Sequence, residues 1–184
     1  MLSADDPALR ALRNALGEYP TGVAIATTRT PAGPVGVTVN SFGSLSLDPP
    51  LVLWCLRRGS ARLPDFTAAE NFAISVLAGE QEQVARQFAA RTPPGTPLAR
   101  QQFAARDWQE DPHGLPVLAG AVAAFACRRA TQLPGGDHVI IIGELLDFQV
   151  IAQRRGSGRE APLIFHGGRY NSLAATAAGA AIGS

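Results

Sequence analysis

The sequence predicts a mainly β protein: a closed or partly closed antiparallel barrel with a few flanking helices. Two observations support this prediction. Most of the regular pattern is strand-like, either alternating or continuously apolar over short runs, and few segments have helical spacing. Several strand candidates follow one another across turns rich in Gly and Pro, as in hairpins. The length of 184 residues fits one domain with a full hydrophobic core.

The chain is expected to open with an amphipathic helix. Asp6 followed by Pro7 is typical of a helix start, leucines follow at spacings of three and four, and Gly17 marks the end. The apolar period then changes to two. Residues 22–28 (GVAIATT) and 35–40 (VGVTVN), separated by TPAGP, therefore predict a hairpin whose second strand has valines on one face and small or polar residues on the other.

The middle of the chain predicts two more strands and a short helix. Residues 51–57 (LVLWCLR) form a continuous apolar run, and 71–77 (NFAISVL) alternate. Between them Ser60 can cap a short helix that ends near Phe66. A second helix is expected over 80–91 (EQEQVARQFAAR), because its apolar residues share one helical face.

The second half of the chain predicts a long hairpin and a final short strand. The loop 92–97 (TPPGTP) holds enough Pro and Gly to forbid regular structure. Residues 120–133 and 137–151 read as two long strands, and the Pro-Gly-Gly between them indicates a hairpin with a longer turn. A short strand over 162–167 (PLIFHG) follows.

Composition excludes several classes of function. The net charge is +1, and the 16 basic residues are all arginines scattered along the chain. No binding surface for nucleic acid or membranes is therefore expected. The absence of lysine rules out Schiff-base chemistry and a P-loop lysine. No signal-like segment or apolar run of membrane-spanning length is present, which predicts a cytoplasmic protein.

Metal, hydrolase and Rossmann motifs are also missing. Cys55 and Cys127 have no CxxC spacing, and the three histidines have no ligand periodicity, so no metal site is expected. There is neither a GxSxG elbow for a serine nucleophile nor a GxGxxG loop for a dinucleotide.

One stretch, 38–46 (TVNSFGSLS), gathers small hydroxyls and an amide where an ordinary strand would end. By periodicity alone these are edge residues that satisfy their own backbone. Alternatively, short donors and a freely accessible backbone suit a flat heteroaromatic ligand.

Two further sites allow both a plain and a functional interpretation. Ser60, with Arg57 or Arg62 nearby, is either an ordinary helix cap with solvated arginines or a phosphate site at a helix start. His138 follows a glycine turn at the mouth of a buried strand. It is either a turn residue satisfied by Asp137 or part of an active site.

Together these segments resemble the flavin reductase family, which has the FMN-binding split-barrel fold. The likeness runs from about Leu9 to Leu173. Its order and spacing make it more specific than any single motif. The matching segments are YPTGVAIATT (19–28), GVTVNSFGSLSLDPPLVLWCL (36–56), NFAISVL (71–77) before VARQFA (84–89), GDHVIIIGEL (136–145) and PLIFHGGRYNSL (162–173).

The resemblance implies an antiparallel Greek-key split barrel and a set of site residues. The residues implied to contact flavin are Thr38, Val39, Asn40, Ser41, Phe42, Ser46, Asp48, Pro49, Cys55, Arg57, Ser60, Arg62 and Phe88. Those implied on the nicotinamide side are His138, Arg169 and Tyr170, with His138 also the candidate catalytic residue. Two positions depart from the family pattern: Gly43 replaces a small side chain, and Arg62 replaces a frequent Thr.

The function implied by the resemblance is hydride transfer from NADH or NADPH to FMN or FAD, with the reduced flavin leaving for a separate monooxygenase. The alternatives are a flavin or haem carrier or redox sensor on the same barrel, and an oxidase of a pyridoxine-phosphate-like amine. The resemblance also implies a homodimer. The expected organisation is a single domain over 1–173 followed by a flexible Ala- and Gly-rich tail over 174–184.

Overall fold

The computed structural model describes residues 6–90, 96–104, 108–150 and 161–172. Its strands are β1 (Thr21–Gly22), β2 (Ala24–Thr30), β3 (Gly33–Val39), β4 (Gly43–Leu47), β5 (Pro50–Arg57), β6 (Asn71–Val76), β7 (Trp108–Glu110), β8 (Pro116–Leu118), β9 (Ala123–Gly135), β10 (His138–Val150), β11 (Leu163–His166) and β12 (Arg169–Ser172). Its helices are α1 (Pro7–Gly17), α2 (Leu63–Ala68), α3 (Glu82–Ala89) and α4 (Pro97–Ala104), with a 3-10 turn over Gly79–Gln81.

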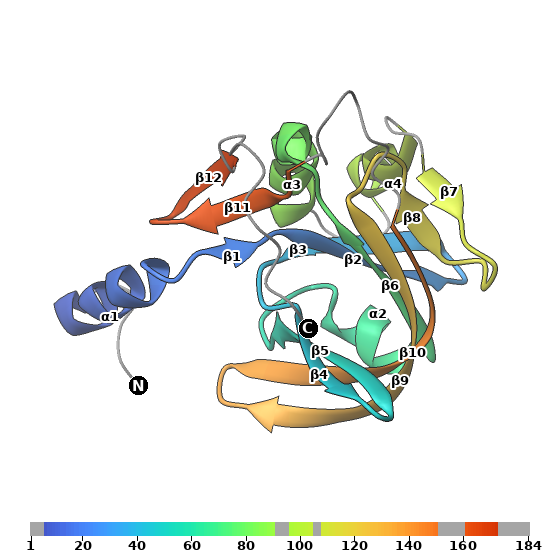
Figure 1. Cartoon of the computed structure of the whole chain (residues 1–184), viewed down its shortest axis with the longest axis horizontal. Coiled ribbons are helices and arrows are strands. Elements are labelled where there is room, and N and C mark those ends of the chain that lie inside the picture. Colours follow the sequence, from blue (N-terminus) through green and yellow to red (C-terminus); the bar gives the residue numbers. More distant parts are fainter. Residues whose placement is uncertain (1–5, 91–95, 105–107, 151–160, 173–184) are drawn as a thin grey trace, which may run out of the picture.

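Seven strands form one antiparallel sheet in the order β3-β2-β6-β9-β10-β5-β4. The long β9–β10 hairpin lies in the middle of this order, and its register shifts twice, between Ile142 and Gly143 and between Leu145 and Asp147. Such irregularities bend strands. The sheet curves so that β4 and β5 come to face β2 and β3 (Figure 1). This confirms the prediction of a mainly β, partly closed antiparallel barrel.

The interior of the barrel is filled largely by aromatic and aliphatic side chains. Trp54 of β5 is fully buried and meets Phe66 of α2 and Phe72 of β6 edge-on, at ring-centroid distances of 5.0 and 5.7 Å. Ile74 and Ile141 complete this core. Burying several such side chains contributes roughly 1.5–3 kcal/mol each.

A second core lies outside the barrel, under α3. Val84 and Phe88 of α3 pack with Ile25 of β2 and with Leu163 of β11. In Figure 1, α3 and α4 lie together over the side of the sheet that carries β2 and β3. The helices are therefore held on the outer face of the strands that the sequence predicted as the first hairpin.

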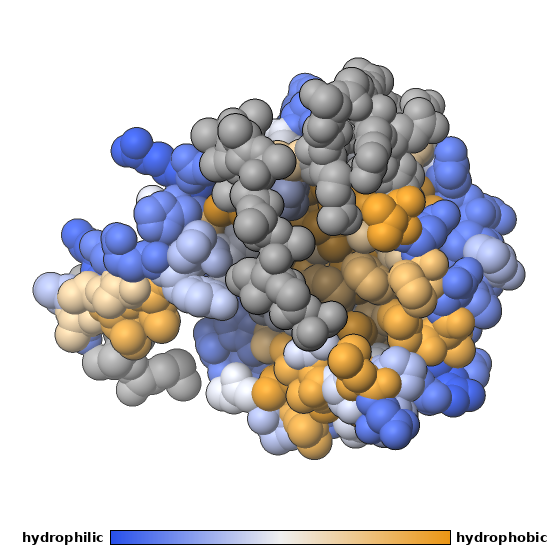
Figure 2. All heavy atoms as spheres, in the orientation of Figure 1, coloured by the Kyte–Doolittle hydropathy of each residue, from blue (hydrophilic) through white to orange (hydrophobic). Residues whose placement is uncertain are grey.

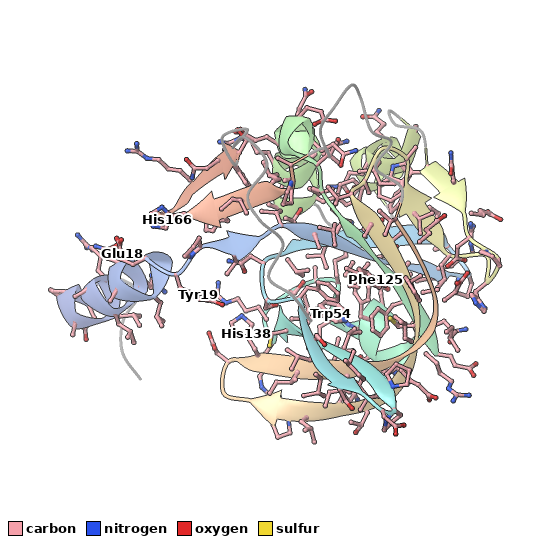
Figure 3. All side chains as sticks on the ribbon, viewed as in Figure 1. Glu18, Tyr19, Trp54, Phe125, His138 and His166 are labelled. Atoms are coloured by element: carbon pink, nitrogen blue, oxygen red, sulfur yellow. The ribbon has the colours of Figure 1, made fainter. Side chains whose placement is uncertain are left out.

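The first helix is confirmed, with Asp6 at its N-cap accepting a 2.8 Å hydrogen bond from the backbone N–H of Ala8. It projects away from the barrel (Figure 1), and none of its residues is buried. Its C-terminal end is tied to β11: the backbone N–H of Gly167 donates to the Gly17 carbonyl at 2.9 Å, and Glu18 lies 3.7 Å from His166. Figure 3 shows Glu18 and His166 side by side at this junction.

Two local predictions were wrong. Ser60 does not cap α2, because its Oγ accepts a hydrogen bond from the N–H of Arg62 at 3.2 Å and forms a turn before the helix begins at Leu63. The turn of the long hairpin is short and not long: Pro134 and Gly135 remain in β9, and Gly135 pairs directly with His138.

Several elements lack a strong sequence signal. The strand β4 alternates serine and leucine and reads as a polar loop, whereas β7, β8 and β12 have only three or four residues each. The expected loop 92–97 lies mostly outside the described residues, and Pro97 begins α4. The expected tail over 174–184 lies outside them entirely, so the domain boundaries stay a prediction. No helix in the described ranges is long and apolar enough to cross a membrane.

Candidate functional site

A cavity of about 870 Å³ opens where five segments meet: the end of β3, the end of β5 with its following turn, the start of β10, the C-terminal end of α3 and one residue of α4. The sequence-predicted residues that line it are Thr38, Val39, Asn40, Ser41, Cys55, Arg57, Ser60, Arg62, Phe88 and His138. Segments up to 100 residues apart in the chain thus converge on one cavity. The cofactor and nicotinamide contacts proposed for these residues stay predictions.

Six other predicted residues do not line this cavity. Phe42 packs into the barrel core, with its ring centroid 5.4 Å from that of Phe125. Ser46, Asp48 and Pro49 lie at the turn between β4 and β5, where Ser46 Oγ accepts from the N–H of Asp48.

The other two residues are on β12. Arg169 is exposed. Tyr170 packs against Phe165 at 5.3 Å, and the Arg86 guanidinium lies 4.9 Å from its ring centroid. The pKa of the Tyr170 phenol is raised, chiefly by partial burial, and the nearby Arg86 charge offsets part of this rise.

Two of the small hydroxyls in the cavity wall are already engaged in holding the fold together. Thr38 Oγ1 donates to the carbonyl of Ala85 at 2.7 Å, which fastens β3 to α3. Ser41 Oγ accepts from the N–H of Cys55 at 2.9 Å and donates to the Cys55 carbonyl at 3.3 Å. The plain and the functional interpretations of this stretch are therefore compatible, since the same residues close the barrel and line the cavity.

The turn after β5 brings three arginines to the cavity. Arg57 and Arg58 are exposed, whereas Arg62 is only 8% exposed. Within the described residues, the Arg62 guanidinium forms no hydrogen bond or ion pair. Burial raises the pKa of the Asp65 carboxyl, and the nearby Arg62 charge offsets part of that rise. Arg62 lines the cavity and its guanidinium nitrogens are not fully buried, so their unused donors are available there and favour an anionic ligand.

His138 lies at the mouth of the cavity, opposite Arg57 in the β10–β5 register. Its Nδ1 is 2.8 Å from Asp137 Oδ1. This hydrogen bond and the histidine charge lower the pKa of Asp137, and Arg57 adds a smaller effect in the same direction. Figure 3 shows His138 at the edge of the barrel, while Trp54 and Phe125 lie inside it.

Sequence reasoning missed part of the cavity wall. The residues not predicted as site residues are Gly36, Val37, Leu56, Arg58, Gly59, Ala61, Ala89, Ala90, Gln102 and Asp137. Arg58 could have been found from its neighbour Arg57, and Gly36 from its place on the polar face of the hairpin strand. Gln102 comes from α4, for which the sequence carried no clear signal. It is held in place by a 2.8 Å bond from its Nε2 to the Gln87 carbonyl.

The fold and cavity define a class of protein: an antiparallel split barrel with a pocket lined by three arginines. Residues 16–174 match the flavin reductase like domain. The chain belongs to this family, which confirms the expected resemblance.

Two curated relatives and one solved structure illustrate the similarity. The chain is 44% identical over 161 residues to the FMN reductase (NADH) SmoA of Agrobacterium fabrum, covering 88% of this chain and 84% of the relative. It is 37% identical over 155 residues to the 4-hydroxyphenylacetate 3-monooxygenase reductase component of Pseudomonas aeruginosa, covering 84% and 89%.

The structure superposes on the NADH:FAD oxidoreductase SgcE6 of Streptomyces globisporus with a TM-score of 0.81 and 38% identity, over 96% of this chain and 100% of that one. SgcE6 has also been solved in complex with NAD and FAD fragments. The expected fold is therefore confirmed, and the relatives support a reductase and not a carrier or sensor.

Proposed function

We propose that this protein oxidises NADH or NADPH and reduces FMN or FAD, and that the reduced flavin serves a separate flavin-dependent monooxygenase. The relatives support the reaction, because they are named as NADH-dependent flavin reductases and as reductase components of monooxygenases. The observation in this structure that carries the proposal furthest is Arg62, a residue only 8% exposed that lines the cavity and whose guanidinium has no hydrogen-bonding partner among the described residues.

The cavity fits a flavin in chemistry and in size. An arginine presents a planar fork of donors that matches phosphate geometry, and Arg62 has these donors uncommitted within the described part of the chain. The backbone of Gly59 and Ala61 lines the same wall, and Ser60 lies between them. A volume near 870 Å³ falls within the range of cavities that hold cofactor-sized ligands. We therefore assign the turn after β5 to the flavin phosphate and the end of β3 to the flavin ring.

The mouth of the cavity suits the nicotinamide. Asp137 holds Nδ1 of His138, which fixes the imidazole orientation and leaves Nε2 directed away from that bond. Arg57 lies directly across from His138 and adds positive charge for the nucleotide phosphates. Arg169 and Tyr170, which lie outside the cavity wall, would take part only through a further surface, such as that of a second subunit.

The chemistry supplied by the bound nucleotides is hydride transfer from C4 of the nicotinamide to N5 of the flavin. The protein holds the two rings in contact and excludes water from between them. No side chain has to act as a nucleophile or general base, which agrees with a cavity where three of the six titratable residues are arginines.

We also propose a homodimer. The helix α1 presents Leu12, Leu16 and the adjoining Tyr19 to the surface, exposed by 54, 67 and 76%. Figure 2 shows this apolar side of α1 standing apart from the rest of the molecule. An isologous contact with a second copy would cover it. Light scattering should give twice the 19.2 kDa chain mass, and a fully active monomer at micromolar concentration would contradict the dimer.

A steady-state assay tests the proposed function. Purified protein is mixed with NADH or NADPH and an excess of FMN, FAD or riboflavin, and nicotinamide oxidation is followed by absorbance. We expect flavin-dependent turnover. Flavin binding without nicotinamide oxidation would instead support a carrier. The absorbance spectrum of the fresh protein also separates retained from diffusible flavin. A cytoplasmic location follows from the same proposal, since the reaction draws on the reduced nicotinamide pool.

A further inference from the structure

The absence of a side chain at Gly36 lets an aromatic ring lie directly on β3. Gly36 faces α3, on the opposite face of the strand from Val35 and Val39, which pack into the barrel core. A Cβ atom at Gly36 would lie 2.6 and 2.8 Å from Cε1 and Cδ1 of Phe88. Such distances are far below van der Waals contact, so the Phe88 ring can occupy its place only against a glycine.

Two other aromatic rings restrict the movement of Phe88. Phe103 and Trp108 pack against it, with ring centroids 5.2 and 5.4 Å from its own and 4.7 Å from each other. The Cβ atom considered above would also lie 3.3 Å from Cζ of Phe103. Aromatic packing of this density leaves no space for the ring to retreat.

The helix that carries Phe88 is itself fixed. The Thr38 hydroxyl holds the Ala85 carbonyl at 2.7 Å, and Gln102 holds the Gln87 carbonyl at 2.8 Å. Phe88 is 2% exposed and lines the cavity together with Gly36. A displaced ring must therefore either enter the cavity or break these helix contacts.

We propose that Gly36 is a positioning residue that acts through Phe88 to set the width of the cavity between β3 and α3, and so determines whether a planar three-ring heterocycle can enter. This inference rests on the proposed function, because flavin is the ligand whose ring would occupy that width. It concerns the ring and not the phosphate. The effect of a substitution at Gly36 should therefore be the same for riboflavin, FMN and FAD.

The test compares Gly36→Ala with Gly143→Ala. A Cβ at Gly143 would lie 2.5 Å from Cζ of Phe72 and 2.9 Å from Cβ of Cys127, so it creates a similar clash between a strand and a phenylalanine ring. Gly143 does not line the cavity. Both variants should lose thermal stability. Only Gly36→Ala should raise the Kd and KM of all three flavins, by about tenfold, with kcat at saturating flavin within twofold of wild type.

A second measurement separates positioning from general damage. Phe88→Ala removes the two closest atoms that the new Cβ would meet and leaves only the 3.3 Å approach to Cζ of Phe103. In that background Gly36→Ala should change flavin affinity less than twofold. Additive losses would overturn the inference, as would flavin affinity that is unchanged in Gly36→Ala or equally weakened in Gly143→Ala.

The crystal structure of Gly36→Ala provides a readout that does not depend on flavin. It should show the Phe88 ring displaced from β3, and a ring in its original place would overturn the inference even if flavin binding were lost. Wild-type protein that binds no flavin would contradict the proposed function instead, so the two failures are distinguishable.

Discussion

The two faces of β5 differ in what they do for the molecule. One face carries Val52 and Trp54, which are 7 and 0% exposed and packed into the barrel, and Leu56, 4% exposed, continues this face to the cavity wall. The other carries Cys55 and Arg57, which line the cavity. Because side chains alternate along a strand, a single segment supplies both the core and the candidate site. Stability and binding should therefore be separable by substitutions one residue apart.

The largest loss of folding stability is expected for a substitution inside the barrel. Phe72→Ala removes a side chain that is 2% exposed and that contacts Trp54. It should lower the free energy of unfolding by about 3–5 kcal/mol. Denaturant titration measures this loss, and flavin titration at low temperature should show the Kd of the folded fraction within twofold of wild type. A large change in that Kd would mean that the core and the cavity are not independent.

On the cavity side, Arg62→Met should remove phosphate recognition without harming the fold. A charge-assisted hydrogen bond is worth about 1.5–3 kcal/mol, so FMN affinity should fall roughly ten- to hundredfold. Isothermal titration with FMN and with riboflavin provides the measurement, because riboflavin has no phosphate and should be unaffected. Arg13→Met on α1 is the matched control. Equal losses for both ligands would place Arg62 against the ring.

Ser41 contributes both to the closure of the barrel and to the cavity wall. Ser41→Ala removes two hydrogen bonds to the Cys55 backbone and should cost about 1–2 kcal/mol of stability. Ser41→Leu should in addition fill the ring site and weaken flavin binding more than it weakens the fold. Unfolding and flavin titration on the same samples test this. Unchanged flavin affinity in Ser41→Leu would reduce the residue to a structural role.

The smallest predicted effect is a change in kcat/KM for NADH caused by a substitution at the cavity mouth. His138→Ala removes one oriented hydrogen bond and should lower kcat/KM for NADH by about two- to tenfold, at a cost of about 0.5–1.5 kcal/mol. Flavin affinity should remain near wild type. Steady-state kinetics with each substrate varied in turn decide the outcome. An unchanged nicotinamide dependence refutes the role, and a loss of flavin binding moves His138 to the flavin side.

The sequence predicted the alternating faces well and the partners of individual hydroxyls poorly. The period of two in β3 places its valines on the barrel side and the small and polar residues on the other side, as observed. β5 was predicted from a continuous apolar run, which does not indicate that Trp54 faces the core. The bonds that occupy Thr38 and Ser41 could not be foreseen, because their partners lie 47 and 14 residues away and depend on how α3 and β5 pack. The cavity wall from α4 was missed for the same reason, since Gln102 reaches it through tertiary contacts.

The bond between Ser41 and Cys55 has a consequence for motion. Backbone pairing between β4 and β5 ends at Gly43 and Leu53. Beyond that pair, the segment before β4 is hydrogen-bonded to β5 through the Ser41 hydroxyl and not through backbone pairing. Separating Ser41 from Cys55 breaks two hydrogen bonds, worth about 2 kcal/mol, which is far less than the free energy of global unfolding. The Cys55 amide should therefore exchange with deuterium sooner than the amides of the β9–β10 hairpin. We therefore expect local opening between Ser41 and β5 at the cavity wall, with the pairing of the seven-stranded sheet unchanged.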